Sequence, residues 1–387
     1  MKTIYFDNNA TTKMDEQVLE EMKPYFCRLY GNPSSMHTFG GQISHKIAHA
    51  REQVAGLLGC EPSEIIFTSG GTESDNTAIK GILAAAPNKR KIITTRVEHP
   101  AVLTVCRERE VRGYSVIELG VDKDGKLDIS ELEQEVDDDT ALVTIMYANN
   151  ETGVIFPIDK ITDIVKAKGA IFHTDGVQAV GKIPLDLSRS NIDLLSISGH
   201  KLHGPKGVGV LYIRKGTRLS PYQLGGHQES GKRAGTENVP GIIGLGKACE
   251  IAQKNINDEN IKVKKLRDKL EKAILETCPD CMVNGEREHR LPNTSNISFE
   301  YVEGEAILLM LDQHGICASS GSACTSGSLE PSHVLRAMGV PFTAAHGSIR
   351  FSLSKYNTEE EIDYTIETVP PIINRLRELS PFVPKNV

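Results

Sequence analysis

The segment "LLSISGHKLHGPKGVGVLYIRKG" (residues 194–216) joins two short apolar runs through a turn rich in glycine and basic residues. The flanking runs "LLSIS" and "GVGVLYI" have the length and apolar content of buried strands. The turn between them holds His200, Lys201, His203 and Lys206, and a turn of this composition packs poorly but presents its side chains well. The segment therefore predicts a strand end that carries functional groups.

Further strand-like runs alternate with helix-like stretches over residues 40–255. The other apolar runs in this region are "EIIFTS", "KIITTR", "SVIELG", "ALVTIMYA" and "AIFHTD". Alternation of this kind is typical of an α/β fold built around a largely parallel sheet. We therefore predict a large α/β domain over residues 16–255.

The composition changes after the charged helical stretch "INDENIKVKKLRDKLEKAILE". Beyond it come the strand-like "NTSNISFE", a helix near residues 304–314, the strand "GSIRFSLS" and a final helix from about residue 358. This pattern predicts a second, smaller α+β domain. We assign residues 1–15 and 256–387 to it.

Charge and composition exclude several classes of protein. The formal net charge is −7 and no basic tail is present, so the signature of a nucleic-acid binder is missing. No apolar stretch reaches the roughly 20 residues of a membrane helix, and "MKTIYFDNNATTKMDE" has no signal-peptide core. We expect a cytoplasmic protein with free thiols among its eight scattered cysteines. The pair "CPDC" (278–281) could bind zinc or act in redox chemistry, but without a second pair we favour a surface turn and no resident metal.

Polar groups follow five of the predicted strands. Ligands of an open parallel sheet bind beyond the carboxyl ends of its strands, so these groups are expected to lie close together. They are, in chain order, Gly70, Gly71 and Thr72; His99; Asn149 and Asn150; Asp175 and Gln178; and Ser198, His200 and Lys201.

Gly70, Gly71 and Thr72 open the helical run "ESDNTAIKGILAAA" directly after a strand. Free backbone N–H groups at such a helix start suit a phosphate, although a plain helix cap has the same pattern. The Walker pattern is missing, which argues against a nucleoside triphosphate.

Asp175 and Lys201 indicate which phosphate-bearing ligand the site would bind. Asp175 ends an apolar run and could either pair with a protonated ring nitrogen or cap the following turn. Lys201 lies beside His200, where burial and a cationic neighbour favour a nucleophilic amine. A lysine for an imine, a carboxylate for a ring nitrogen and an anion site are together what pyridoxal phosphate requires.

A second cluster lies near the C-terminus. Every residue from Ala318 to Ser328 is small, which predicts a mobile loop at about 318–330 that carries Cys324. In "GSIRFSLS", Arg350 alternates with apolar residues and could bind a carboxylate, or could be a solvated strand arginine.

Taken together, these segments resemble the cysteine desulfurases of the NifS type, which are pyridoxal-phosphate enzymes. The resemblance covers nearly the whole chain and rests on many motifs in the same order. They include "YFDNNATT", "TSGGTESDN", "YANNETG", "HTDGVQAVGK", "SGHKLHGPKGVG", "KRAGTENV", "SSGSACTSGSLEPSHVLRA" and "AAHGSIRFSLS". It implies an aspartate-aminotransferase-like fold (fold type I), with a mainly parallel seven-stranded sheet in the large domain.

The resemblance also implies how the cofactor is held. Lys201 would bind pyridoxal 5'-phosphate covalently, Asp175 would pair with the ring nitrogen and His99 would stack on the ring. Gln178 and Asn150 would contact the ring oxygen and the substrate region. The phosphate would be held by Gly71, Thr72, Ser198 and His200, and by Thr236 of a neighbouring subunit, which implies a homodimer with shared sites.

The implied reaction converts L-cysteine to L-alanine. Arg350 would bind the substrate carboxylate, Lys201 or His99 would move protons, and Cys324 would accept the sulfur as a persulfide. That persulfide would pass to an iron–sulfur scaffold protein and could transiently ligate a nascent cluster.

The sequences of these motifs resemble most closely those of the nitrogen-fixation branch of the family, which implies a role in nitrogenase maturation. The housekeeping iron–sulfur branch, a selenocysteine lyase and a general aminotransferase remain alternatives, since all of them would use the same cofactor residues. A non-enzymatic scaffold would have no use for Lys201 and Asp175 at matched strand ends.

Overall fold

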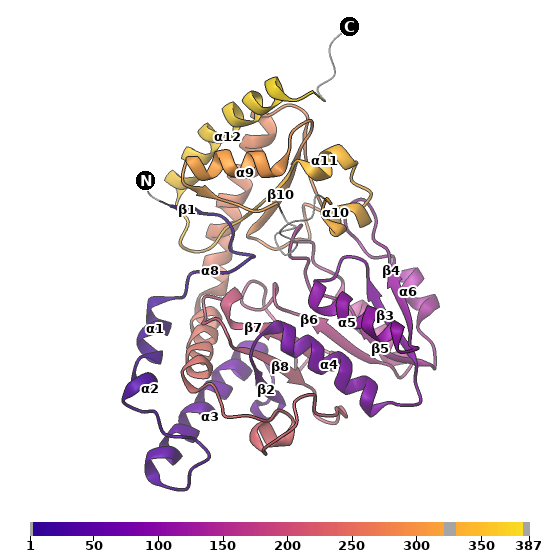
Figure 1. Cartoon of the computed structure of the whole chain (residues 1–387), viewed down its shortest axis with the longest axis vertical. Helices are drawn as coiled ribbons and strands as arrows, with labels where there is room; N and C mark the ends of the chain where they lie inside the picture. Colours follow the sequence, from indigo (N-terminus) through magenta and orange to yellow (C-terminus); the bar gives the residue numbers. More distant parts are fainter. Residues whose placement is uncertain (1–2, 321–329, 382–387) are drawn as a thin grey trace.

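The structure, a computed structural model, describes residues 3–320 and 330–381 (Figure 1). Its largest sheet has seven strands in the order β2-β8-β7-β6-β5-β3-β4. All neighbours pair in parallel except β2 with β8 and β8 with β7. The strands are β2 (Ile65–Thr68), β3 (Lys91–Thr95), β4 (Ser115–Leu119), β5 (Thr140–Thr144), β6 (Ile171–Asp175), β7 (Leu194–Ser198) and β8 (Gly209–Ile213). The predicted mainly parallel seven-stranded sheet is confirmed.

Helices bury both faces of this sheet, which explains why its strands read as continuous apolar runs. Successive side chains of a strand point to opposite faces, so Ile65 and Phe67 enter one apolar core and Ile66 enters another. Helices α4 (Gly71–Ala85) and α5 (Pro100–Val111) pack on the Ile66 side. Helices α3 (Thr38–Leu58), α7 (Ile158–Ala167) and the first part of α8 (Val239–Thr277) pack on the other side.

The C-terminal part has its own core around a three-stranded antiparallel sheet in the order β12-β10-β9. These strands are β9 (Cys281–Val283), β10 (Thr294–Phe299) and β12 (Ser348–Ser352), and α9 (Gly304–Gln313) and α12 (Glu359–Leu379) cover them. Strand β1 (Ile4–Tyr5) pairs in parallel with β11 (Ile316–Cys317), and Phe6 enters the same core. The N-terminal segment is thus built into the C-terminal part of the chain.

Helix α8 connects the two cores, and it is the long helix that runs down the molecule in Figure 1. Its Ile242 and Leu245 belong to the core beneath the large sheet, whereas Leu270 and Ile274 belong to the C-terminal core. The predicted domain boundary at residue 255 falls inside this helix, and the division at that residue stays a prediction. Shorter helices fill the connections: α1 (Glu16–Met22), α2 (Pro24–Cys27), α6 (Ile129–Glu135), α10 (His333–Ala337) and α11 (Phe342–His346).

The seven cysteines that the structure describes are free thiols. Cys278 and Cys281 do flank a turn, in which Asp280 has a φ of 49° and Cys281 Sγ lies 2.9 Å from the Cys278 carbonyl oxygen. Cys278 is buried, however, so the prediction of a surface turn is wrong for that residue.

Within residues 3–320 and 330–381, every helix is too short or too polar to span a lipid bilayer.

Candidate active site

A cavity of about 340 Å³ lies at the carboxyl ends of the parallel strands. Most of the predicted site residues line it, although they come from six separate stretches of the chain. They are Gly71, Thr72, His99, Asn150, Asp175, Gln178, Ser198, His200, Lys201 and Arg350. The clustering expected of residues that follow parallel strands is therefore present in the structure.

Lys201 ends a 3₁₀ turn (Gly199–Lys201) directly after β7. Its Nζ donates to the carbonyl oxygens of Asn9 at 2.5 Å and Ala10 at 2.7 Å. Asn9 is itself fixed, because its Nδ2 donates to Thr294 Oγ1 at 2.9 Å and to the Asn150 carbonyl oxygen at 3.1 Å. The N-terminal segment therefore forms one wall of the site, a role that sequence reasoning did not assign to Asn9.

Asp175 ends β6 and is almost completely buried. Its Oδ1 accepts from the N–H of Val177 at 2.9 Å, so the alternative of a turn cap also holds for this oxygen. Burial raises the pKa of the Asp175 carboxyl, while the nearby His99 and Lys201 oppose that rise. No arginine, lysine or histidine nitrogen in the described part of the chain lies within ion-pair distance of Asp175. A cationic ring N–H at this position would supply the missing partner.

His99 is the N-cap of α5, and its Nδ1 accepts from the Ala101 N–H at 3.1 Å. Burial lowers the pKa of the ring, with Lys201 acting in the same direction and Asp175 against it. The ring is therefore neutral near pH 7, and since Nδ1 accepts, Nε2 carries the proton. A neutral imidazole with a defined tautomer can both stack on an aromatic ring and exchange protons.

A buried polar cluster lies behind Asp175. His173 is a satisfied core histidine, as expected from its place inside a strand, with Thr144 Oγ1 at 2.8 Å and Ser196 Oγ at 3.0 Å. Burial lowers its pKa to about 3. Asp75 Oδ1 lies 3.6 Å from His173, and burial followed by the nearby Asp175 raises the pKa of Asp75 well above its usual range. Sequence reasoning missed Asp75, although it lies one helical turn after Gly71.

The start of α4 is open to the cavity. Helix α4 has no side-chain cap, so the first N–H groups of the helix are available to a ligand. A Cβ atom at Gly71 would lie only 2.8 Å from Val177 Cγ2, so a larger residue here would force Val177 in the turn after β6 to shift. Ser198 and His200 border the same opening, where Thr11 Oγ1 lies 3.1 Å from His200 Nδ1. Burial, together with the neighbouring lysines, lowers the pKa of His200 to about 4.

Arg350 lies in β12 with only 3% of its surface exposed. The alternative of a solvated strand arginine is therefore wrong. Its Nη1 donates to the Asn150 carbonyl oxygen at 2.9 Å and its Nη2 to Asp7 Oδ1 at 2.8 Å. The buried Nε has no partner among the residues that the structure describes. A guanidinium fixed in this way at the cavity wall keeps a donor for a ligand carboxylate.

Two predicted site residues are not part of this cavity. Thr236 lies in a separate recess that it shares with Ser69, Gly207 and Arg233. Ser69 and Gly207 also border the opening at the start of α4, so Thr236 lies beyond that opening rather than inside it. Cys324 lies outside the residues that the structure describes.

These residues fit pyridoxal phosphate. The buried Asp175 carboxyl has no cationic partner within ion-pair distance in the described residues, and the uncapped start of α4 suits the phosphate. The Lys201 amine lies on the same cavity, which gives the covalent link a position between these two anchors. Carboxyl, amine and helix start are the three features that the cofactor needs.

Comparisons with known proteins agree with this geometry. A family model described as aminotransferase class-V matches residues 4–365. A cysteine desulfurase of Nostoc sp. is 63% identical, over 99% of this chain and 96% of the relative. The cysteine desulfurase NifS of Azotobacter vinelandii is 57% identical, over 99% of this chain and 95% of that protein. A solved structure described as a NifS-like protein superposes with a TM-score of 0.91 at 43% identity, over 97% of this chain and 100% of that one.

Proposed function

The chain belongs to the aminotransferase class-V family, and on that premise we propose that it is a pyridoxal-phosphate-dependent cysteine desulfurase that converts L-cysteine to L-alanine. The observation that carries the proposal is one cavity that combines Lys201, Asp175, the open start of α4 and the buried Arg350. These four features together suit pyridoxal phosphate and an amino-acid substrate with a free carboxylate.

Each residue of the cavity has a separate role in the proposed reaction. Pyridoxal phosphate, when bound, supplies an electron sink for bond cleavage at an amino acid. Asp175 would keep the ring nitrogen protonated, and the start of α4 with Thr72, Ser198 and His200 would hold the phosphate. Gln178 and Asn150 would contact the ring oxygen and the substrate region.

Arg350 orients L-cysteine by its carboxylate, which directs the substrate sulfur to one side of the cavity. The Lys201 amine and His99 Nε2 move protons at the substrate carbons. The Cys324 thiolate attacks the substrate sulfur, so an S–S bond forms as the C–S bond breaks. The substrate carbon that loses the sulfur takes up a proton, and the product leaves as L-alanine. Cys324 keeps the sulfur as a persulfide. Overall, L-cysteine and one thiol give L-alanine and one persulfide.

The reaction would supply sulfur to an iron–sulfur scaffold protein. The similarity to NifS of Azotobacter vinelandii favours nitrogenase maturation as the pathway that receives this sulfur. A cytoplasmic location suits the seven described free thiols, since a reducing compartment keeps cysteines unpaired. A homodimer with shared sites is supported by Thr236, which lies outside the cavity of its own chain. The exposed Phe26, Tyr30 and Met36 provide apolar surface for such an interface.

The purified chain, reconstituted with pyridoxal phosphate, is expected to release L-alanine and sulfide in equal amounts from L-cysteine and excess thiol. The yellow colour of the bound cofactor should be present before substrate is added. Amino-acid analysis and sulfide determination test this result. The same assay with L-selenocysteine measures a lyase side activity. Transfer of the amino group to a 2-oxo acid without sulfide would identify an aminotransferase instead.

Arg350→Ala is expected to raise the KM for L-cysteine about 100-fold, because the charged hydrogen bonding of the guanidinium to the substrate carboxylate is lost. Cofactor content, measured by absorbance, should change little. Arg350→Lys keeps the charge but not the planar fork and should give an intermediate KM. The exposed Arg336→Ala is the matched control and should keep the wild-type KM. A variant that lost its cofactor but bound L-cysteine normally would contradict the assignment.

A further inference from the structure

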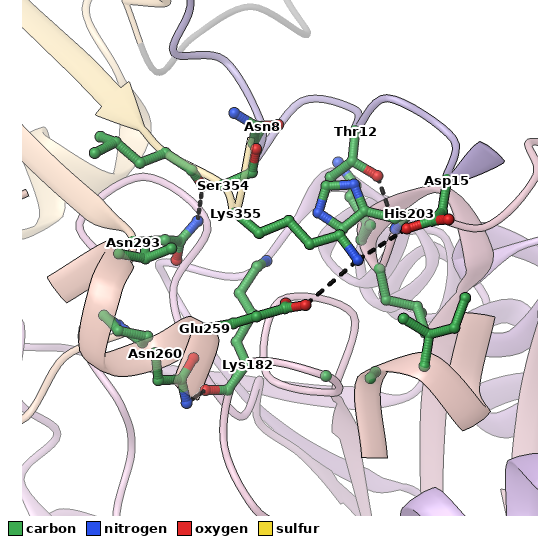
Figure 2. Close-up of a pocket in the computed structure, with 18 of the residues that line it drawn as sticks. Asn8, Thr12, Asp15, Lys182, His203, Glu259, Asn260, Asn293, Ser354 and Lys355 are labelled. Carbon is green, nitrogen blue, oxygen red and sulfur yellow. Dashed lines mark hydrogen bonds and ion pairs between the residues drawn. The ribbon is translucent and has the colours of Figure 1, made fainter. Parts of the chain in front are cut away.

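Lys182 is a half-buried lysine that has no role in the proposed mechanism. It follows β6 in the motif "HTDGVQAVGK" and borders a second, smaller cavity of about 50 Å³ on the far side of Lys201. Figure 2 shows Lys182 beside Asn260 of α8, with the N-terminal residues Asn8 and Thr12 higher in the view. The Lys182 carbonyl oxygen accepts from Asn260 Nδ2 at 2.7 Å, which fixes the backbone at this point.

The side chain of Lys182 makes its hydrogen bonds with Gln178. Its Nζ donates to Gln178 Oε1 at 2.8 Å and to the Gln178 carbonyl oxygen at 3.2 Å. Gln178 Nε2 in turn donates to the Asn9 carbonyl oxygen at 2.9 Å, and the same oxygen accepts from Lys201 Nζ. Lys182 is therefore connected to Lys201 through Gln178 and Asn9.

Lys182 has no acidic partner in the part of the chain that the structure describes. The two carboxylates of its cavity are engaged elsewhere, since Lys355 Nζ lies 3.0 Å from Asp15 and 3.4 Å from Glu259 (Figure 2). Burial, with Lys201 and Arg350 nearby, lowers the pKa of Lys182 to about 7. A partly desolvated amine without a counter-ion is unfavourable for folding, and a methionine of similar length would avoid that penalty. This placement points to a role in the site rather than in the core.

The contacts also fix the orientation of the Gln178 amide. The Lys182 amine donates to Gln178 Oε1, and the Asn9 carbonyl oxygen can only accept, so the amide oxygen faces Lys182 and the amide nitrogen faces Asn9. The amide nitrogen is then left on the side of the Asn9 carbonyl and the cofactor cavity, which Gln178 lines. The Asn9 carbonyl oxygen, which accepts from Gln178 Nε2, favours the same orientation, so Lys182 and Asn9 hold the amide from its two ends.

We propose that Lys182 is a positioning residue that holds the Gln178 amide with its N–H groups directed at the cofactor's ring oxygen. The inference rests on the proposed function, because it assigns Lys182 to the same pyridoxal-phosphate site. It goes beyond that function because a residue of the second cavity would determine the orientation of a cofactor-binding side chain in the first.

Lys182→Met, which keeps the length but removes the donors, tests the proposal. The absorption band of the lysine-linked cofactor should shift, and the cofactor should bind about tenfold more weakly, the effect of one lost hydrogen bond to a charged donor. Both are measured without substrate, by spectroscopy and by titrating cofactor into the apo chain. Lys182→Arg, which keeps a donor, should restore the wild-type band. In a Gln178→Leu background, Lys182→Met should have no further effect, because the two residues act as a unit.

Lys355→Met is the matched control, since it removes a lysine from the same cavity that contacts Asp15 and Glu259 rather than Gln178. It should lower the melting temperature and leave the band unchanged. A Lys182→Met chain with a lower melting temperature but wild-type band and cofactor affinity would show a structural role and overturn the proposal. A wild-type chain that forms no lysine-linked cofactor at all would instead overturn the proposed function, so the two failures are distinct.

Discussion

Lys201→Ala is expected to abolish covalent attachment of the cofactor and to lower turnover of L-cysteine by about 10⁴-fold or more. The variant loses the amine that holds the cofactor and also the base that moves the substrate proton. The carbonyl oxygens of Asn9 and Ala10, which accept from Lys201 Nζ, lose their donor at the same time. Borohydride reduction followed by peptide mapping measures the attachment, and a steady-state assay measures the turnover.

Lys206→Ala is the matched control for this variant. Lys206 lies in the same glycine-rich turn and is exposed; it borders the opening at the start of α4 but does not line the cavity that holds the Lys201 amine. The control chain should keep the reducible link at Lys201. Reduction that labels another lysine in Lys201→Ala, with turnover retained, would refute the assignment.

Cys324→Ala is expected to separate cofactor chemistry from sulfur transfer. The variant should bind pyridoxal phosphate and L-cysteine as the wild type does, because neither binding step uses the thiol. Release of L-alanine and sulfide should fall by at least about 10³-fold, since the substrate sulfur has lost its nucleophile. Absorbance changes on adding L-cysteine report binding, and product analysis reports the reaction.

Mass spectrometry after one turnover without reductant locates the sulfur. The peptide with Cys324 should gain one sulfur atom, whereas Cys317 in β11 should not. Burial, with Asp312 and Asp7 nearby, raises the pKa of the Cys317 thiol, so little thiolate is present there at neutral pH. Cys317→Ala is therefore the control and should keep full activity. A fully active Cys324→Ala chain would leave a pyridoxal-phosphate lyase in place of a desulfurase.

Local patterns were sufficient to predict the strands of the large sheet and the functional residues at their ends. Residues such as Asp175 and Lys201 are marked by their position directly after an apolar run, and parallel strands bring such positions together. The pattern around Arg350 left two alternatives, because alternation on a strand does not say what covers its polar face. The structure decides between them through burial of Arg350 against Asp7 and Asn150.

The missed residues depend on contacts between distant parts of the chain. Asn9 reaches Lys201 only because the N-terminal segment crosses to a turn 192 residues later. Lys182 borders the site only because α8 and the segment around Lys355 close a second cavity around it. Neither contact leaves a signal in the sequence, since periodicity reports the local structure of one segment and not which distant segment it meets.

The pairing of the N-terminal segment with the C-terminal core sets an order of events during synthesis. Strand β1 pairs with β11, the Asn8 N–H donates to the Ser352 carbonyl oxygen, and the Asn9 N–H donates to Ser352 Oγ. Ribosomes add about 5–20 residues per second, so this segment waits roughly 17–70 s after its own translation before its partners at residue 352 exist. Until then Lys201, translated near the midpoint, has no Asn9 carbonyl to donate to. The cofactor pocket is thus completed only when the last strand leaves the ribosome, and a nascent chain stalled before residue 352 should bind no pyridoxal phosphate.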